Sequence, residues 1–164
     1  MTGQTMQARV IKDNALWLLL VISAIVVDES YFFEYRFNFT LLVVFYLGVK
    51  WNISSAFLWA FVVGLVLDSI SMRLIGPNIL SKATVVFLTH FFKTGIFNLA
   101  SMLGAILCFF FTIIDAGIVY TSLSLFDVRP TQPVTAFNLI LFQAITNSIM
   151  AYFLFDRDES EEQV

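Results

Sequence analysis

The chain has 164 residues, of which 59% are apolar and only 13% are charged, whereas a soluble globular domain is about 45–50% apolar and about 25% charged. So few charges cannot cover the surface of a domain of this size, and we expect hydrocarbon to be its solvent. The net charge of −3 and the lack of any Lys/Arg cluster give no reason to expect a nucleic-acid partner or a polybasic lipid-binding tail.

The N-terminal third begins with a polar stretch, residues 1–14, which we expect to be a frayed cytoplasmic segment. The first apolar segment, residues 15–27, is short for a membrane core that needs about 20 residues. We therefore expect its helix to begin near Ala8 or to continue into the next loop. Residues 28–38 mix acids with aromatic side chains, which predicts an interfacial segment with rings at the headgroups and charges in water.

The middle of the chain alternates apolar segments with short polar turns. Spans are predicted over 39–49, 53–70 and 79–92. Residues 96–126 form the longest apolar run, interrupted only by Asp115. As one helix it would be about 46 Å long, so it must tilt, bend or project beyond the bilayer.

A loop with two prolines precedes a sixth span at 134–155, and residues 156–164 form an acidic cytoplasmic tail that we expect to be disordered. The sequence thus predicts an all-α integral membrane domain over 15–155, a bundle of six short transmembrane helices. Six spans place both termini on one side. Positive residues favour the cytoplasm for that side by five (Arg9, Lys12, Lys50, Lys93, Arg157) to three (Arg36, Arg73, Arg129).

Charges within the spans need an explanation, because each costs at least about 2.5–3.5 kcal/mol at membrane depth. Counting residues from the nearest turn places Asp68, Lys82 and Asp115 in the outer half of the bilayer. A network of these three residues, joined by Arg73, fits that placement. Such contacts more often hold helices together than carry protons, and we expect His90 to be a satisfied or interfacial side chain.

Small residues recur at helical spacing on three of the predicted spans. One stripe consists of Ala56, Ala60, Gly64 and Asp68; a second consists of Ser101, Ala105, Cys108, Thr112 and Asp115; a third consists of Gln143, Asn147 and Ala151. Small residues at this spacing let helix backbones approach closely. We expect the first two stripes to pack against each other, with Asp68 aimed at a neighbouring helix.

Motifs for chemistry are missing from the sequence. It has no Gly-rich phosphate loop and no nucleophile elbow, and its one histidine excludes a metal site built from several histidines. We therefore expect no enzymatic activity, no cofactor and no metal.

The segment Gly64-Leu-Val-Leu-Asp68-Ser-Ile, followed by Gly76 and Leu80, resembles the Gly…Asp…Gly…Leu signature of the bacterial rod shape-determining protein MreD family. The resemblance extends over nearly the whole chain, to Tyr35-Arg36-Phe37-Asn38, Asp115 and Asn147. The chain departs from the family pattern at Phe37, where proline is common, at Lys82, where a small or apolar residue is usual, and in its acidic tail.

This resemblance implies a non-enzymatic inner-membrane scaffold of the cell-elongation machinery, which directs peptidoglycan synthesis in rod-shaped bacteria. It implies binding to MreC, a single-span protein with a periplasmic coiled coil, and through it to the actin-like MreB and the peptidoglycan synthases. It also implies a bundle similar to the substrate-binding subunits of energy-coupling-factor vitamin transporters. The residues expected in structural or partner contacts are Asp68, Lys82, Asp115, Asn147, Arg36, Ala56, Ala60, Gly64 and Gly76.

An alternative function is a substrate-capture subunit of such a transporter. These subunits usually carry an Ala-x-x-x-Ala pair on the first span, where it docks the energising module. Here the first span has only Ala15 and Ala24, and the pair Ala56/Ala60 stands on the third span instead. Membrane lipids are expected partners under either function.

Overall fold

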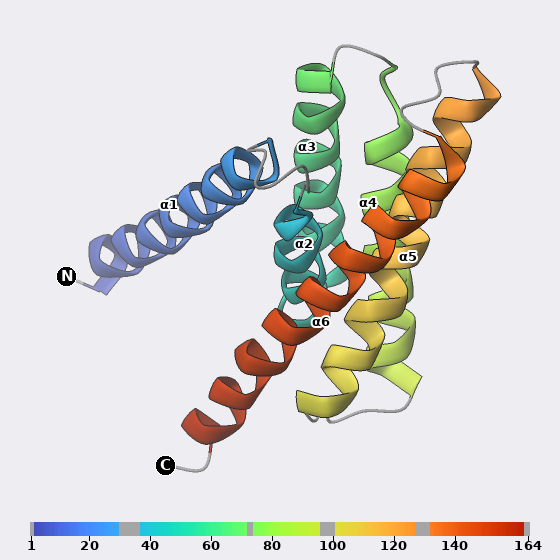
Figure 1. Ribbon diagram of the computed structural model, residues 1–164. Coiled ribbons are helices and arrows are strands. Elements are labelled where there is room, and N and C mark those ends of the chain that lie inside the picture. Colours follow the sequence, from blue (N-terminus) through green and yellow to red (C-terminus); the bar gives the residue numbers. More distant parts are fainter. Residues whose placement is uncertain (1, 30–36, 72–73, 96–100, 127–131, 163–164) are drawn as a thin grey trace.

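The computed structural model describes residues 2–29, 37–71, 74–95, 101–126 and 132–162, and all regular structure within them is helical (Figure 1). The helices are α1 (Thr2–Glu29), α2 (Phe39–Lys50), α3 (Ile53–Ser71), α4 (Pro77–Gly95), α5 (Ser101–Leu125) and α6 (Pro133–Glu162). The predicted all-α class and the predicted order of six helices are confirmed for the described residues.

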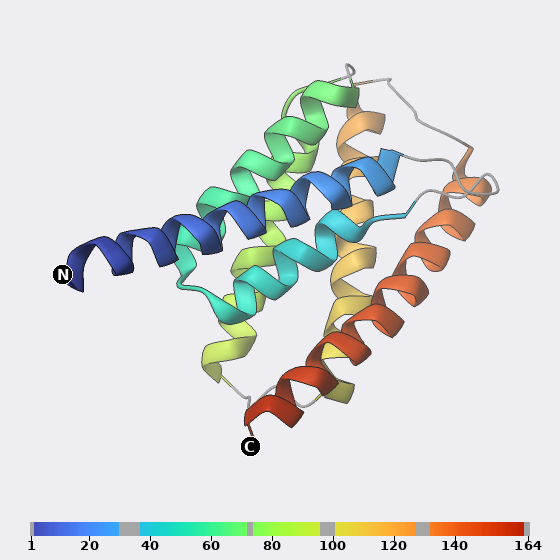
Figure 2. The same ribbon diagram turned by 90° about the vertical axis from the view of Figure 1, so that its left-hand side faces the viewer.

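The shortest helix, α2, lies at the centre of the bundle. It packs against all five other helices, and its residues Thr40 to Phe45, Leu47 and Gly48 are buried. Around it, α3 packs along α4, α4 also contacts α5, and α5 packs along α6. α1 packs on α2, and its N-terminal half projects away from the other helices (Figure 2).

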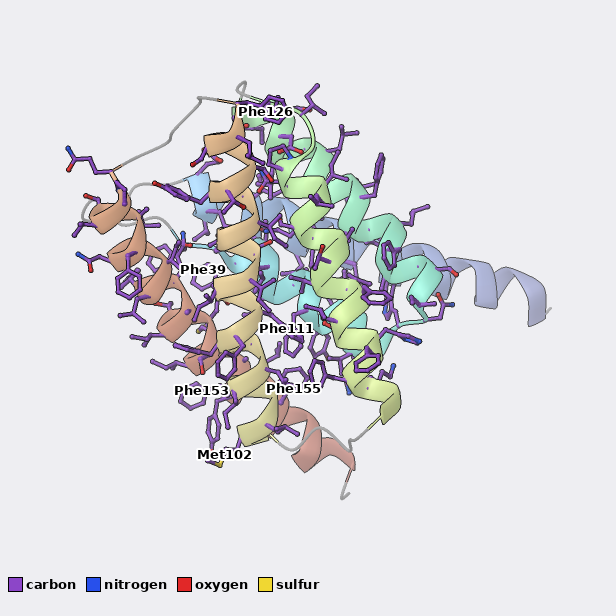
Figure 3. All side chains as sticks on the ribbon, turned by 90° about the vertical axis from the view of Figure 1, so that its right-hand side faces the viewer. Phe39, Met102, Phe111, Phe126, Phe153 and Phe155 are labelled. Carbon is purple, nitrogen blue, oxygen red and sulfur yellow. The ribbon has the colours of Figure 1, made fainter. Side chains whose placement is uncertain are left out.

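Three helices in the described part of the chain are long and apolar enough to cross a membrane, over Ile53–Ser71, Met102–Leu125 and Pro133–Phe155, while α2 is a shorter apolar helix. Large apolar side chains cover their outer surfaces. Met102 and Phe153 are 70% and 65% exposed and point outward, whereas Phe111 and Phe155 point between helices (Figure 3). This distribution is compatible with a membrane protein.

The core consists of two clusters that share α2. Ala56, Ala60 and Val63 of α3 pack with residues of α1, α2 and α4 in the first cluster. In the second, the rings of Phe111 and Phe155 meet Phe45 edge-on, with centroids 5.6 and 5.7 Å from it. The central helix therefore contributes buried residues to both clusters.

The expected ends of the first and last helices are wrong. α1 begins at Thr2, so residues 2–14 are helical and not frayed, and α6 continues to Glu162 through most of the tail that was expected to be disordered. Hydropathy marks where apolar sequence ends, but Glu, Gln, Lys and Arg are good helix formers and continue a helix beyond that point.

The expected contact between the stripes of α3 and α5 is also wrong. α4 lies between these helices, so the α3 stripe faces α1, α2 and α4, while the described members of the α5 stripe face α6 and α4. A stripe of small residues shows which face of a helix is closely packed, but it does not identify the neighbour.

Candidate functional site

A cavity of about 560 Å³ lies inside the bundle at the N-terminal end of α2, and side chains from all six helices line it. Helix length explains it. α2 has 12 residues and is about 18 Å long, whereas the 19 residues of α3 and the 25 of α5 extend about 28 and 38 Å. The central helix therefore fills only part of the bundle, and its first residues form the floor of the remaining space.

Asp68, at the C-terminal end of α3, caps the start of α4. Its carboxylate accepts hydrogen bonds from the backbone N–H groups of Gly76 at 2.7 Å, Asn78 at 3.0 Å and Ile79 at 3.3 Å, and from Asn78 Nδ2 at 2.8 Å. α4 begins with Pro77, so the capping position belongs to Gly76, which has no side chain to satisfy these donors. A carboxylate from the preceding helix supplies the cap and also meets the positive end of the α4 dipole.

Two glycines make this cap possible. A Cβ atom on Gly64, one turn before Asp68, would lie 2.5 Å from Ile79 Cα, so only glycine lets the backbones of α3 and α4 approach this closely. Gly76 has a φ of +130° with open space around it, a conformation that residues with a side chain rarely adopt. Gly64, Asp68 and Gly76 therefore act together to fix the α3–α4 hairpin.

Asp28, at the C-terminal end of α1, caps the start of α2 as Asp68 caps the start of α4. Its carboxylate accepts hydrogen bonds from Phe39 N at 2.6 Å, from Thr40 N at 2.8 Å and from the Thr40 hydroxyl. Asn38 occupies the capping position of α2, but its own side chain makes no capping bond. Asp28 is 7% exposed, so the expectation that this acid lies in water is wrong: the buried N–H groups at the start of α2 need an acceptor.

Lys82 of α4 and Asp115 of α5 form a buried ion pair on the floor of the cavity. Lys82 Nζ lies 2.8 Å from both carboxylate oxygens of Asp115, and each side chain is 2% exposed. Asn38 Nδ2 donates a further hydrogen bond to Asp115 Oδ2 at 2.9 Å. The pair therefore connects α4 and α5 to the start of the central helix.

Asn147 extends this arrangement to α6. Its Nδ2 donates to the carbonyl oxygen of Asn38 at 2.9 Å and lies 3.2 Å from Thr112 Oγ1. Its Oδ1 is buried and has no hydrogen-bond partner among the described residues. Together with the ion pair, these contacts attach α4, α5 and α6 to the first turn of α2.

The structure divides the expected three-residue network into two units. Lys82 and Asp115 pair with each other, while the Asp68 carboxylate accepts its hydrogen bonds, among the described residues, from residues 76–79. All three residues nevertheless line the same cavity. Arg36 and Arg73 lie outside the described residues.

The other expected site residues lie away from this cavity. Ala56 and Ala60 are 1% and 0% exposed and pack in the core with α1, α2 and α4. His90 is partly buried on α4 and does not line the cavity. Within the described residues, no group of three His, Cys, Asp or Glu side chains could hold a metal ion.

Sequence reasoning missed the roles of Asp28, Asn38 and Asn78. Asn38 immediately precedes an apolar segment, which is typical of a capping residue, but its side chain reaches Asp115 instead. Asp28 caps α2 from a position ten residues before Asn38, and no local pattern reveals a cap supplied from such a distance. A search for acids in apolar sequence, compared with the helix starts that have no capping side chain of their own, could have suggested both Asp28 and Asp68.

Comparison of the chain with protein-family models, with curated proteins and with solved structures finds no match. The arrangement itself indicates what the buried charges do. Asp28 and Asp68 satisfy helix starts, and Asp115 is held by Lys82 and Asn38. The charged residues that line the cavity thus fix the helices in place.

Proposed function

We propose that this chain is a non-enzymatic scaffold of the bacterial inner membrane that belongs to the cell-elongation machinery and binds an MreC-type single-span protein. Through that partner it would connect to MreB and the peptidoglycan synthases. The proposal takes its partners from the resemblance to the MreD family.

The observation that carries the proposal is the α3–α4 hairpin. Three residues of the resemblance meet there: Gly64 packs against Asn78 and Ile79, and Asp68 accepts hydrogen bonds from the N–H groups of both and of Gly76. They therefore form one physical unit, which supports the proposal. The polar groups of this unit hold helices together, as a scaffold requires.

In the proposed arrangement all six helices lie in the membrane, with both termini in the cytoplasm. α1 and α4 contain more polar residues than the three longest apolar helices, and α2 is short but surrounded by protein. The ends of α3 and α5 and the starts of α4 and α6 then face the periplasm, and the cavity lies on that side.

The test is genetic and biochemical. The gene is deleted cleanly in its rod-shaped host, and an epitope-tagged copy is returned. Loss of rod shape on deletion, rescue by the copy and co-purification of the single-span coiled-coil protein in mild detergent would support the scaffold. Retention of rod shape after the deletion would contradict it.

A second candidate function is substrate capture for an energy-coupling-factor transporter, which the cavity favours because its volume suits a small ligand. The buried position of Ala56 and Ala60 counts against it, because an energising module could not reach this pair. Mass spectrometry of the purified protein decides the point: a vitamin retained at one molecule per chain would favour the transporter.

A further inference from the structure

We propose that the cavity at the start of α2 binds the uncharged head of a membrane lipid, through a hydroxyl or carbonyl oxygen that accepts a hydrogen bond from Lys82. This binding site goes beyond the scaffold function. It rests on the membrane location of the chain and not on the identity of any protein partner.

Lys82 is a buried cation with an incomplete set of hydrogen bonds. An ammonium group has three N–H donors, and the hydrogen bonds of Lys82 go to the two oxygens of Asp115. At least one N–H of Lys82 therefore has no acceptor among the described residues. Lys82 is 1% exposed and lines the cavity. A buried donor on a charged group is costly to leave unsatisfied, so an oxygen atom inside the cavity must complete its set.

The charges around the cavity favour an uncharged ligand. Among the described lining residues, the acids Asp28, Glu29, Asp68 and Asp115 face a single cation, Lys82, which Asp115 already neutralises. A phosphate or carboxylate head would sit close to these carboxylates in a low-dielectric space, where like charges repel strongly. The oxygen that reaches Lys82 should therefore be uncharged, as in a hydroxyl, ester or ether.

The aliphatic part of the lining favours a lipid as the source of that head. Much of the lining is aliphatic and lies on the three longest apolar helices, as with Leu67 of α3, Val119 and Leu123 of α5, and Leu139 and Ile140 of α6. These side chains match the acyl region next to a lipid head, whereas a free polyol would leave them in contact with polar groups. The cavity thus brings polar and aliphatic side chains together, as binding of a lipid where its head joins its acyl chains would require.

The experiment is native mass spectrometry of the full chain in detergent micelles with three added probes. Dioleoylglycerol has a hydroxyl and two ester carbonyls and no charge, dioleoylphosphatidic acid has the same chains with an anionic head, and glycerol is the same head without chains. We expect retention of dioleoylglycerol at one molecule per chain, weaker retention of phosphatidic acid and none of glycerol.

Two variants locate the binding and one controls for it. Ala116→Phe puts a ring into the cavity lining, while Thr121→Phe adds a ring to the exposed face of the same helix. Lys82→Met/Asp115→Asn removes the donor and the charge pair together and keeps an acceptor for Asn38. Affinity for dioleoylglycerol should fall at least about tenfold in Ala116→Phe and in the double variant, and should be unchanged in Thr121→Phe. A melting curve for each variant shows whether it is folded.

Three results would overturn the proposal: stronger retention of phosphatidic acid than of dioleoylglycerol, dioleoylglycerol binding that survives in folded Ala116→Phe, or no retention of any probe, which would mean that water alone fills the cavity. None of these would affect the scaffold function, which is tested by cell shape and partner binding.

Discussion

Replacement of Asp68 by alanine tests whether this acid fixes the α3–α4 hairpin. The change removes the acceptor for the N–H groups of Gly76, Asn78 and Ile79 and for Asn78 Nδ2. A lost helix cap costs about 0.5–2 kcal/mol, and each buried donor left without a partner costs about 1–3 kcal/mol. Because the cap and these donors are largely the same N–H groups, the two costs overlap, and we expect a total loss of about 3–5 kcal/mol.

The assay is thermal unfolding of the purified chain in a mild detergent. For a chain of this length, each kcal/mol of lost stability lowers the melting temperature by about 2–4 °C. The expected loss therefore corresponds to a fall of at least about 6 °C. Asp68→Asn keeps one acceptor oxygen and should lie between the wild type and Asp68→Ala. Ser69→Ala changes an exposed neighbour whose hydroxyl donates to the Leu65 carbonyl of its own helix, and it should change stability by less than about 0.5 kcal/mol. If Asp68→Ala melts within about 2 °C of the wild type, the capping argument is refuted.

Three further predictions use the same assay. Gly64→Ala should lower stability, because its Cβ would lie 2.5 Å from the backbone of Ile79. The control Gly117→Ala on α5, where nothing lies within 4 Å of the added Cβ, should be neutral or stabilise the protein by up to about 1 kcal/mol. Equal effects of the two changes would contradict the close approach of α3 and α4. Lys82→Met should cost about 3–5 kcal/mol by leaving Asp115 buried and unpaired, while Lys82→Met/Asp115→Asn should recover most of that loss; a double variant as unstable as the single one would contradict the ion pair. Asp28→Ala should cost about 2–4 kcal/mol of stability, because the N–H groups of Phe39 and Thr40 lose their acceptor. The exposed control Ser23→Ala should leave stability unchanged. A melting temperature of Asp28→Ala equal to that of Ser23→Ala would show that α2 needs no cap.

The positions of the helices could be predicted because one signal dominates this sequence. Apolar segments are separated by short polar turns, so the predicted spans 39–49 and 53–70 differ by one residue each from α2 and α3. The same signal failed at Thr2, where α1 begins, and at Glu162, where α6 ends, because a helix can continue into polar sequence. Hydropathy reports the solvent around a segment, and backbone hydrogen bonding decides where its helix ends.

The candidate site was predictable only in part. Burial of Asp68, Lys82 and Asp115 follows from their position in apolar sequence, since a charge there must face other protein groups. Their pairing does not follow, because several donors compete for each carboxylate. Asp68 binds the backbone donors at the start of α4, because Gly76, which precedes Pro77 at the capping position, has no side chain to bind them.

The starts of α2 and α4 are both capped by a carboxylate from the preceding helix, which limits the groups that remain to bind a ligand. In each case an acid at the end of one helix satisfies the start of the next, and its carboxylate lies at the positive end of that helix's dipole. The carboxylates of Asp28 and Asp68 are therefore already occupied and offer little to a ligand. Lys82 differs, because its partner Asp115 cannot accept all three of its N–H groups in the observed geometry. Among the described residues, the cavity thus holds a charged donor with a hydrogen bond to spare, and a ligand that binds there must bring the acceptor.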